Sequence, residues 1–167
     1  SKLIKATGAE YIIIGHSENR KLGDTNFIIN KKIRSALKEK LKVIFCIGEK
    51  YSERKKKLTH LVLKKQIKKG LIGIKKNENI IISYEPIWSI GTGLVPNNIE
   101  LKKNINYFKK ILNSLKASKK MKILYGGSVN PGNVKYLAEI TEINGFLIGG
   151  ASLNSKKFID IIKKTIN

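Results

Sequence analysis

The fold of this chain is decided by residues 80–93, IIISYEPIWSIGTG, where a short apolar run ends in a single carboxylate. Ile80, Ile81 and Ile82 form a run that is typical of a buried β-strand, and Glu85 follows where the strand should end. A proline, a tryptophan and two glycines one residue apart come next, a composition that favours a loop. The stretch therefore predicts a strand whose carboxyl end presents an acid beside a loop.

Short apolar runs of this kind alternate along the chain with longer stretches of helical period. The predicted strands are residues 11–15, 43–47, 80–84, 122–125 and 146–148. Such alternation is typical of βαβ units, and the nearly continuous apolar character of the runs fits a parallel sheet covered on both faces. We expect an α/β fold class and a single domain over residues 1–167.

Apolar residues at spacings of three and four predict the helices. One helix is expected after Asp24-Thr25, a second after residues 96–98, and a last one over residues 155–166. Asn130 followed by Pro131 indicates a further helix, with the asparagine as N-cap and the proline as the first helical residue.

The composition indicates a folded soluble protein. The apolar fraction is 41%, and no apolar run approaches the roughly 18 residues of a membrane span. We find no signal peptide and expect a cytoplasmic protein with no membrane partner. The one cysteine, Cys46, lies in an apolar run, which favours a buried inert thiol over a catalytic one. The sequence indicates no metal site and no cofactor.

The net charge of +22 raises the hypothesis of nucleic-acid binding. The lysines, however, are spread through every predicted helix instead of gathering in one arm with interleaved aromatic residues. We favour solvated helix faces, with nonspecific binding of anions, nucleic acid included, expected in either case.

Polar and glycine-rich residues follow the predicted strands. They are His16 to Glu18, Glu85 onward, Gly126 to Ser128, and Gly149-Gly150 with Ser152 nearby. Ligands of parallel α/β folds bind at the carboxyl ends of the strands, so these groups should converge on one rim. Paired glycines ahead of a helix suit a phosphate group, although such a pair is also common in a plain tight turn.

Two titratable residues at this rim have competing interpretations. Glu85, beside a loop able to close over it, is placed as a general base shielded from water; the alternative is a salt bridge with one of the many lysines. His16 directly follows a strand, where a structural histidine is the simpler reading. His60 lies within a predicted helix, and we assign it no role.

Five strings, in this order, resemble the second part of triosephosphate isomerase: GAEYIIIGHSENR, VIFCIGE, YEPIWSIGTG, ILYGGSVNPGNV and NGFLIGGASL. The resemblance covers essentially the whole chain. It implies a truncated (β/α) barrel and interconversion of glyceraldehyde 3-phosphate and dihydroxyacetone phosphate. By this resemblance Glu85 is the base, His16 is the neutral electrophile that polarises the carbonyl, and Glu18 is an acid near the catalytic lysine.

The resemblance also implies a lid over residues 86–94 and a phosphate site. Pro86, Ile87 and Trp88 would begin the lid, and Tyr125 would latch it when closed. The phosphate would meet backbone N–H groups, which lie at Gly91, Ser128, Gly149 and Gly150. Cys46 would be the buried cysteine of the family.

The chain departs from the family in its length. The eight-stranded barrel would have three further strands before residue 1, together with the asparagine and lysine of the first loop. Removing a preorganised charge stabiliser costs orders of magnitude in rate, so we expect a weak or inactive isomerase. Asn19 stands where the family has arginine, and Leu94 where lysine is common.

Five strands cannot close a barrel, which would leave two strand edges open. We expect a homo-oligomer that covers them; a separate N-terminal piece or rearranged helices would serve the same end. Three functional alternatives remain: a working isomerase completed by another chain, a self-assembling relic that keeps only a phosphate site, and a basic nucleic-acid-binding protein.

Overall fold

Strands and helices alternate along the computed structural model, which describes residues 1–74, 79–115 and 121–166. The elements in chain order are α1 (Lys2–Ala6), β1 (Tyr11–Ile14), α2 (Ser17–Lys21), α3 (Asn26–Lys38), β2 (Lys42–Ile47), α4 (Tyr51–Lys55), α5 (Thr59–Gly70), β3 (Ile80–Tyr84), α6 (Asn98–Ser114), β4 (Ile123–Tyr125), α7 (Val134–Ala138), β5 (Gly145–Phe146), the 3-10 helix η1 (Gly150–Leu153) and α8 (Ser155–Ile166). Within this described part, no helix is both long and apolar enough to cross a bilayer.

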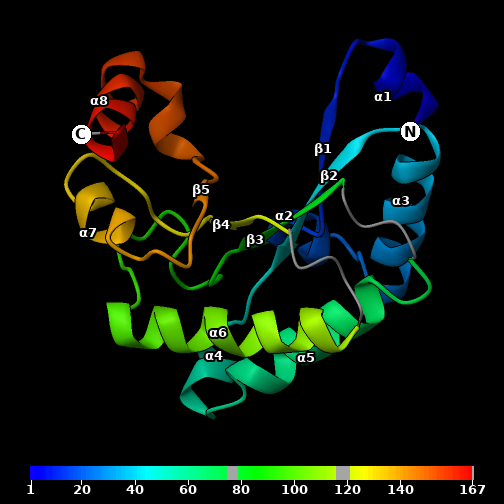
Figure 1. Ribbon diagram of the computed structural model, residues 1–167, viewed down its shortest axis with the longest axis horizontal. Helices are drawn as coiled ribbons and strands as arrows, with labels where there is room; N and C mark the ends of the chain where they lie inside the picture. The colour runs from blue at the N-terminus through cyan, green and yellow to red at the C-terminus, as the bar shows by residue number, and fades with distance from the viewer. Residues whose placement is uncertain (75–78, 116–120, 167) are drawn as a thin grey trace.

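The five strands form one parallel sheet in the order β1-β2-β3-β4-β5, which is also their order in the chain. Every neighbouring pair is parallel, with Val43 opposite Ile80 and Ile82 opposite Ile123. The sheet curves, and α3, α5, α6, α7 and α8 lie around its outside (Figure 1). The predicted α/β class is confirmed, and the arrangement is that of a truncated (β/α) barrel.

The two faces of the sheet differ in burial because the helices that the structure describes cover only the outer one (Figure 1). Outward-facing Val43, Phe45 and Ile82 are fully buried. The Phe45 ring lies against Gly70 of α5, where a Cβ would come within 2.5 Å of it. On the inner face, Ile13 is 45% exposed. The main core therefore lies between the sheet and its helices.

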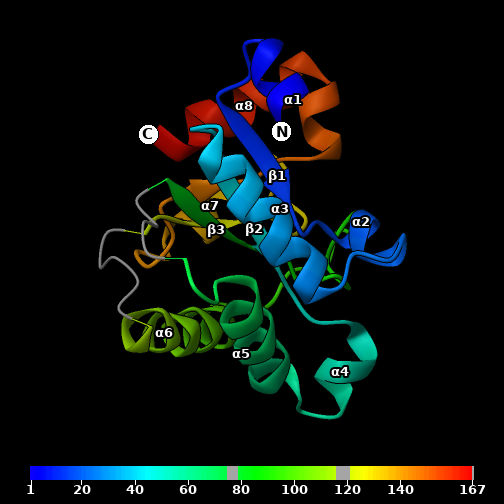
Figure 2. The same ribbon diagram turned by 90° about the vertical axis from the view of Figure 1, so that its right-hand side faces the viewer.

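Both edges of the sheet are open. Among the residues that the structure describes, strand β1 pairs with β2 alone and β5 pairs with β4 alone, and the ribbon is open between them (Figure 1). Turned by 90°, the molecule presents β1 at its surface beside α3 (Figure 2). Tyr11 of β1 is 46% exposed. An unpaired apolar strand of this kind is a template for further pairing.

Two expectations from the sequence are corrected by side-chain hydrogen bonds of asparagine. The helix expected from Pro131 begins instead at Val134, because the Asn130 Oδ1 accepts from the N–H groups of Gly132 and Asn133 and closes a turn. Strand β5 spans Gly145–Phe146 instead of 146–148. Its pairing begins early because Asn144 exchanges two hydrogen bonds with Ile123, through its backbone N–H and its side-chain oxygen.

Strand β2 is closed at its carboxyl end by a helix side chain. The Gly48 N–H donates to Gln66 Oε1 at 2.9 Å, and Gln66 Nε2 donates to the Gly48 carbonyl at 2.9 Å. A Cβ at Gly48 would lie 1.8 Å from the Glu85 carbonyl oxygen, so only glycine fits between the ends of β2 and β3. Buried Gln66 of α5 thereby ties the outer helix layer to the rim.

We predict that Gln66→Leu lowers the free energy of unfolding by about 2–4 kcal/mol, because it leaves two buried backbone groups at Gly48 without partners. Urea unfolding followed by circular dichroism measures this loss. Lys65→Leu, at the exposed neighbouring position, is the control and should change stability by less than about 0.5 kcal/mol. Equal losses in the two variants would contradict this role for Gln66.

Candidate active site

The predicted rim residues converge on one cavity of about 380 Å³ at the carboxyl ends of the strands. His16 follows β1, Glu85 follows β3, and the turn at Gly126-Gly127-Ser128 follows β4. Gly149 and Gly150 follow β5 and complete the opposite wall. Ile90 and Gly91 from the 86–94 segment, defined here as the lid, also line the cavity. Residues far apart in the sequence thus share one site because their strands are parallel.

His16 and Glu85 face each other in this site. The His16 Nε2 lies 3.6 Å from Glu85 Oε2. On the other side of the ring, Nδ1 accepts from the Glu18 backbone N–H at 3.4 Å, which makes His16 the N-cap of α2. Because Nδ1 is the acceptor, the proton of the neutral ring belongs on Nε2. The ring therefore presents a hydrogen-bond donor to the cavity.

The Glu85 carboxyl group is buried, with the residue only 2% exposed. Its Oε1 accepts from the Ser83 hydroxyl at 3.0 Å. Its Oε2, which faces His16, has no hydrogen-bond partner among the residues that the structure describes. Burial raises the pKa of Glu85. Interactions with Cys46, His16 and Ser83 lower this pKa and so partly offset the effect of burial. A desolvated carboxylate with a free oxygen is suited to act as a general base.

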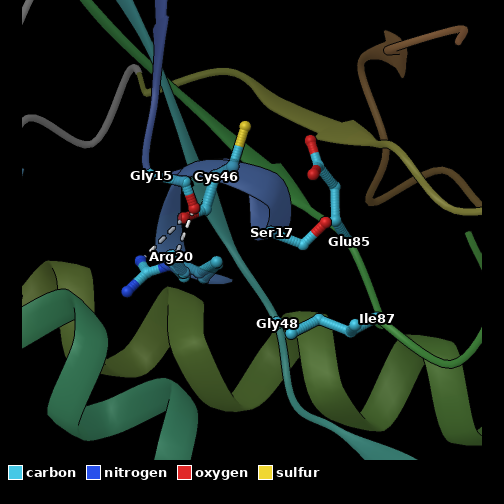
Figure 3. A pocket seen from close by; sticks show the side chains of 8 residues that line it. Gly15, Ser17, Arg20, Cys46, Gly48, Glu85 and Ile87 are labelled. Atoms are coloured by element: carbon cyan, nitrogen blue, oxygen red, sulfur yellow. Dashed lines mark hydrogen bonds between the residues drawn. The ribbon is translucent and has the colours of Figure 1, made fainter. Parts of the chain in front are cut away.

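Close packing fixes the position of Glu85. A Cβ at Gly126 would lie 2.6 Å from Glu85 Cγ and 2.7 Å from Ser83 Oγ. A smaller hollow of about 10 Å³, on the side of Glu85 toward β2, is lined by Gly15, Cys46 and Gly48 among others. Figure 3 shows the Cys46 thiol and the Glu85 carboxyl group in this region. Burial is the main cause that raises the pKa of Cys46, so it remains a thiol, as the inert interpretation requires.

Arg20 connects the ends of β1 and β2. Its Nε donates to the Gly15 carbonyl at 2.7 Å and its Nη2 to the Cys46 carbonyl at 3.1 Å (Figure 3). The Nη1 donates to Asn26 Oδ1 at 2.8 Å. This guanidinium group therefore positions the loop that carries His16, a role that the sequence did not indicate.

The beginning of the lid is held on the outer side of β3 by a second buried carboxylate. Glu49 is fully buried; it accepts from Trp88 Nε1 at 2.9 Å and from the Tyr84 hydroxyl at 3.2 Å. Arg54 lies over the Trp88 ring at 4.3 Å. Burial raises the pKa of Glu49, and the Trp88 and Tyr84 bonds partly offset this. The Ile87 N–H also donates to the Glu49 carbonyl, at 2.9 Å.

Tyr125, the predicted latch, contacts the lid through Ser89. The Tyr125 hydroxyl lies 3.0 Å from Ser89 Oγ, and the Ser128 N–H donates to the same oxygen at 3.1 Å. Ser89 also donates to the Leu94 carbonyl, which joins the middle of the lid to its last residue. The Ser128 N–H, predicted to bind phosphate, is therefore occupied by a lid hydroxyl here.

The remaining predicted residues lie as follows. Gly91 lines the cavity with a φ of +71°, which favours glycine. A Cβ at Gly149 or Gly150 would meet nothing within 4 Å, so the backbone there is open to a ligand. Glu18 does not line the cavity; its side chain is 80% exposed and Oε2 lies 3.8 Å from His16 Nδ1. Within residues 1–74, 79–115 and 121–166, no three metal-ligating side chains gather.

Sequence reasoning missed several residues of the site. For Ser83 and Ser89, the sequence offers no signal except their position. Ser83 stands two residues before Glu85, and this spacing places the side chains of Ser83 and Glu85 on the same face of the strand. Lys157 of α8 also lines the cavity and brings a cation to it. In the sequence, nothing distinguishes this residue from the other lysines.

Comparison with known proteins now decides the family. The family model described as triosephosphate isomerase matches residues 1–165. This chain belongs to the triosephosphate isomerase family. A triosephosphate isomerase of Thermodesulfovibrio yellowstonii is 44% identical over 164 residues, which cover 96% of this chain and 67% of that protein. That of Dictyoglomus turgidum is 43% identical over 167 residues, covering 96% of this chain and 67% of its own length.

The chain therefore spans about two thirds of the length of these relatives. It is similar to that of Prosthecochloris aestuarii too, at 42% identity over 66% of that protein. The resemblance noted from the five sequence strings is confirmed at the level of the family.

We predict that Glu85→Gln stabilises the fold in a pH-dependent way. Because burial raises the folded pKa of Glu85 above its unfolded value, the folded state holds the proton more tightly. The wild-type free energy of unfolding therefore falls as the pH rises from the unfolded pKa of about 4.3 through the folded pKa. The variant does not titrate, so its stability relative to wild type grows over this window and is constant above it.

Urea unfolding at a series of pH values measures this difference. Glu18→Gln is the matched control, because the exposed Glu18 carboxylate has little desolvation to relieve. If the stability difference between Glu85→Gln and the wild type is independent of pH, or shrinks as the pH rises, then burial does not raise the pKa of Glu85.

Proposed function

We propose that these 167 residues carry the proton-transfer and phosphate-binding part of a triosephosphate isomerase. The observation that carries the proposal is the facing pair of His16 Nε2 and Glu85 Oε2, 3.6 Å apart, at one wall of the cavity. The opposite wall is built from open glycine turns that suit a phosphate group. A small phosphorylated carbonyl compound fits this division of the site, and no cofactor is needed for the chemistry.

In the proposed reaction, Glu85 takes a proton from the carbon next to the carbonyl group of the triose phosphate. The His16 Nε2–H donates to the carbonyl oxygen, where negative charge develops. His16 Nε2 gives its proton to this oxygen and takes up the proton of the neighbouring hydroxyl group. Glu85 returns its proton to the former carbonyl carbon, so the aldehyde becomes a ketone with no net change in atoms. The buried setting of Glu85 supports this role, because a desolvated carboxylate is a stronger base.

We infer that the chain alone is a weak or inactive isomerase. By resemblance to the family, an asparagine and a lysine of the first loop stabilise the developing charge. That loop belongs to the third of the relatives' length that this chain does not match. Preorganised donors of this kind contribute about 10²–10³ in rate each. A cytoplasmic location and a place in glycolysis belong to the same proposal.

We expect isomerase turnover to rise by about 10²-fold or more when the chain is mixed with the N-terminal third of the Thermodesulfovibrio yellowstonii relative. Turnover of glyceraldehyde 3-phosphate is followed with each part alone and with both. Glu85→Gln, prepared identically, should abolish the gain. A gain that survives Glu85→Gln would contradict the role of Glu85, and turnover by the chain alone at the same rate would contradict its incompleteness.

We further infer that copies of the chain associate through the open edges of β1 and β5. Half-exposed Tyr11 and Ile13 on β1 support this, because association would remove apolar side chains and unpaired strand groups from water. Sedimentation velocity should show a concentration-dependent dimer or larger species, and Ile13→Lys should shift it toward monomer. A wild-type chain that stays monomeric at about 100 μM would rule out this association.

The net charge of +22 also allows nonspecific contact with nucleic acid. The cavity lining, which includes glycine turns and the His16–Glu85 pair, supports the isomerase over that function.

A further inference from the structure

The Ser89 hydroxyl lies where the lid, the Tyr125 latch and the turn after β4 meet. We propose that Ser89 is a positioning residue that holds the lid in place by occupying the Ser128 N–H, and that a substrate phosphate releases the lid by taking this N–H. The inference rests on the proposed function, since it assigns the trigger for lid movement to the phosphate site of that enzyme.

The hydrogen-bonding capacity of Ser89 is filled in this arrangement. A serine hydroxyl has one proton to donate and two lone pairs to accept with. The proton goes to the Leu94 carbonyl, and the Ser128 N–H donates to one lone pair at 3.1 Å. The Tyr125 hydroxyl, 3.0 Å away, must then be a donor to the other. Burial raises the pKa of Tyr125 to about 12, so it keeps the proton that this bond needs.

Close packing holds this hydroxyl cluster together. Ser89 is fully buried although it lies in the lid. A Cβ at Gly127 would lie 2.2 Å from Tyr125 Oη and 2.6 Å from Ser89 Oγ, so the two hydroxyl groups rest directly on the glycine backbone. The lid is therefore attached to the turn that precedes Ser128 by side-chain contacts as well as by hydrogen bonds.

A phosphate group in the cavity would compete with Ser89 for the same donor. Gly126, Gly127 and Ser128 line the cavity next to Gly91 of the lid. One backbone N–H makes one strong, well-aligned bond, so Ser89 and a phosphate oxygen cannot both have it in full. The phosphate oxygen is charged and is the stronger acceptor, so it takes the N–H.

Loss of this bond loosens the lid at Ser89. Ser89 loses the N–H donor that fixes it to the turn, and the Tyr125 hydroxyl remains as its contact with the end of β4. The bond between Ser89 and the Leu94 carbonyl joins the middle of the lid to its last residue, so the loosening at Ser89 reaches that end of the lid. Phosphate binding and lid movement are thereby coupled through one hydroxyl group.

The test compares inorganic phosphate binding by the wild type, Ser89→Ala and Ser114→Ala, each as the 167-residue chain. Binding is followed at low salt by the Ser128 amide signal in ¹H–¹⁵N spectra and by fluorescence of Trp88, the one tryptophan in the sequence. We expect Ser89→Ala to bind phosphate roughly three- to ten-fold more tightly, because the competing acceptor is gone. Ser114→Ala, the same change at the end of α6, should bind as the wild type does.

A merely structural role for Ser89 predicts equal or weaker binding in Ser89→Ala, and either result overturns the proposal while leaving the phosphate site in place. Absence of saturable phosphate binding in the wild type overturns both this proposal and the phosphate site of the proposed function. If Ser89→Ala does not fold, the phosphate titration of the wild type provides the test. The proposal requires the Ser128 amide signal and the Trp88 fluorescence to change with the same midpoint. A Ser128 amide signal that stays fixed while the amide signals of Gly149 and Gly150 shift overturns the proposal.

Discussion

The structure depends on the burial of one carboxyl group, that of Glu85, at the end of a strand. Taking a carboxylate out of water is costly unless it is well hydrogen-bonded, and here Ser83 satisfies one oxygen while the other faces His16 without a bond. Glycines at positions 48 and 126 are required so that the neighbouring strand ends come close enough to enclose it. The chain thus gives up stability at the residue proposed as the base.

A second buried carboxylate, Glu49, lies on the other side of β3 and makes a separate contribution. Successive residues of a strand point to opposite faces, so Ser83 and Glu85 point inward while Tyr84, between them, points outward to Glu49. Trp88 binds Glu49, whereas Ser89 binds the turn on the inner side. The lid is therefore held from both faces of the sheet by adjacent residues.

Much of this could be predicted because it follows from short-range pattern and strand direction. The apolar runs at β2 and β3 and the stripe of α8 gave nearly correct bounds, and the parallel sheet placed His16 and Glu85 at one rim. Asn130 misled because its side chain closes a turn as readily as it caps a helix. Ser89 and Arg20 could not be found, because their partners lie up to 39 residues away in the sequence, and only the folded backbone brings them together.

The paired hydrogen bonds between Gly48 and Gln66 have a consequence for how the sequence can evolve. The Gln66 side-chain amide takes the place of a peptide group of a neighbouring strand at Gly48, and the last backbone bond beyond it runs from the Ile87 N–H to the Glu49 carbonyl. Insertions or exchanges at residues 56–58, between α4 and α5, can then accumulate without disturbing β2. The glycine and the glutamine depend on each other, however, and a lineage that loses one has little reason to keep the other. We expect the two positions to be inherited as a unit, independently of the reaction proposed for the rim.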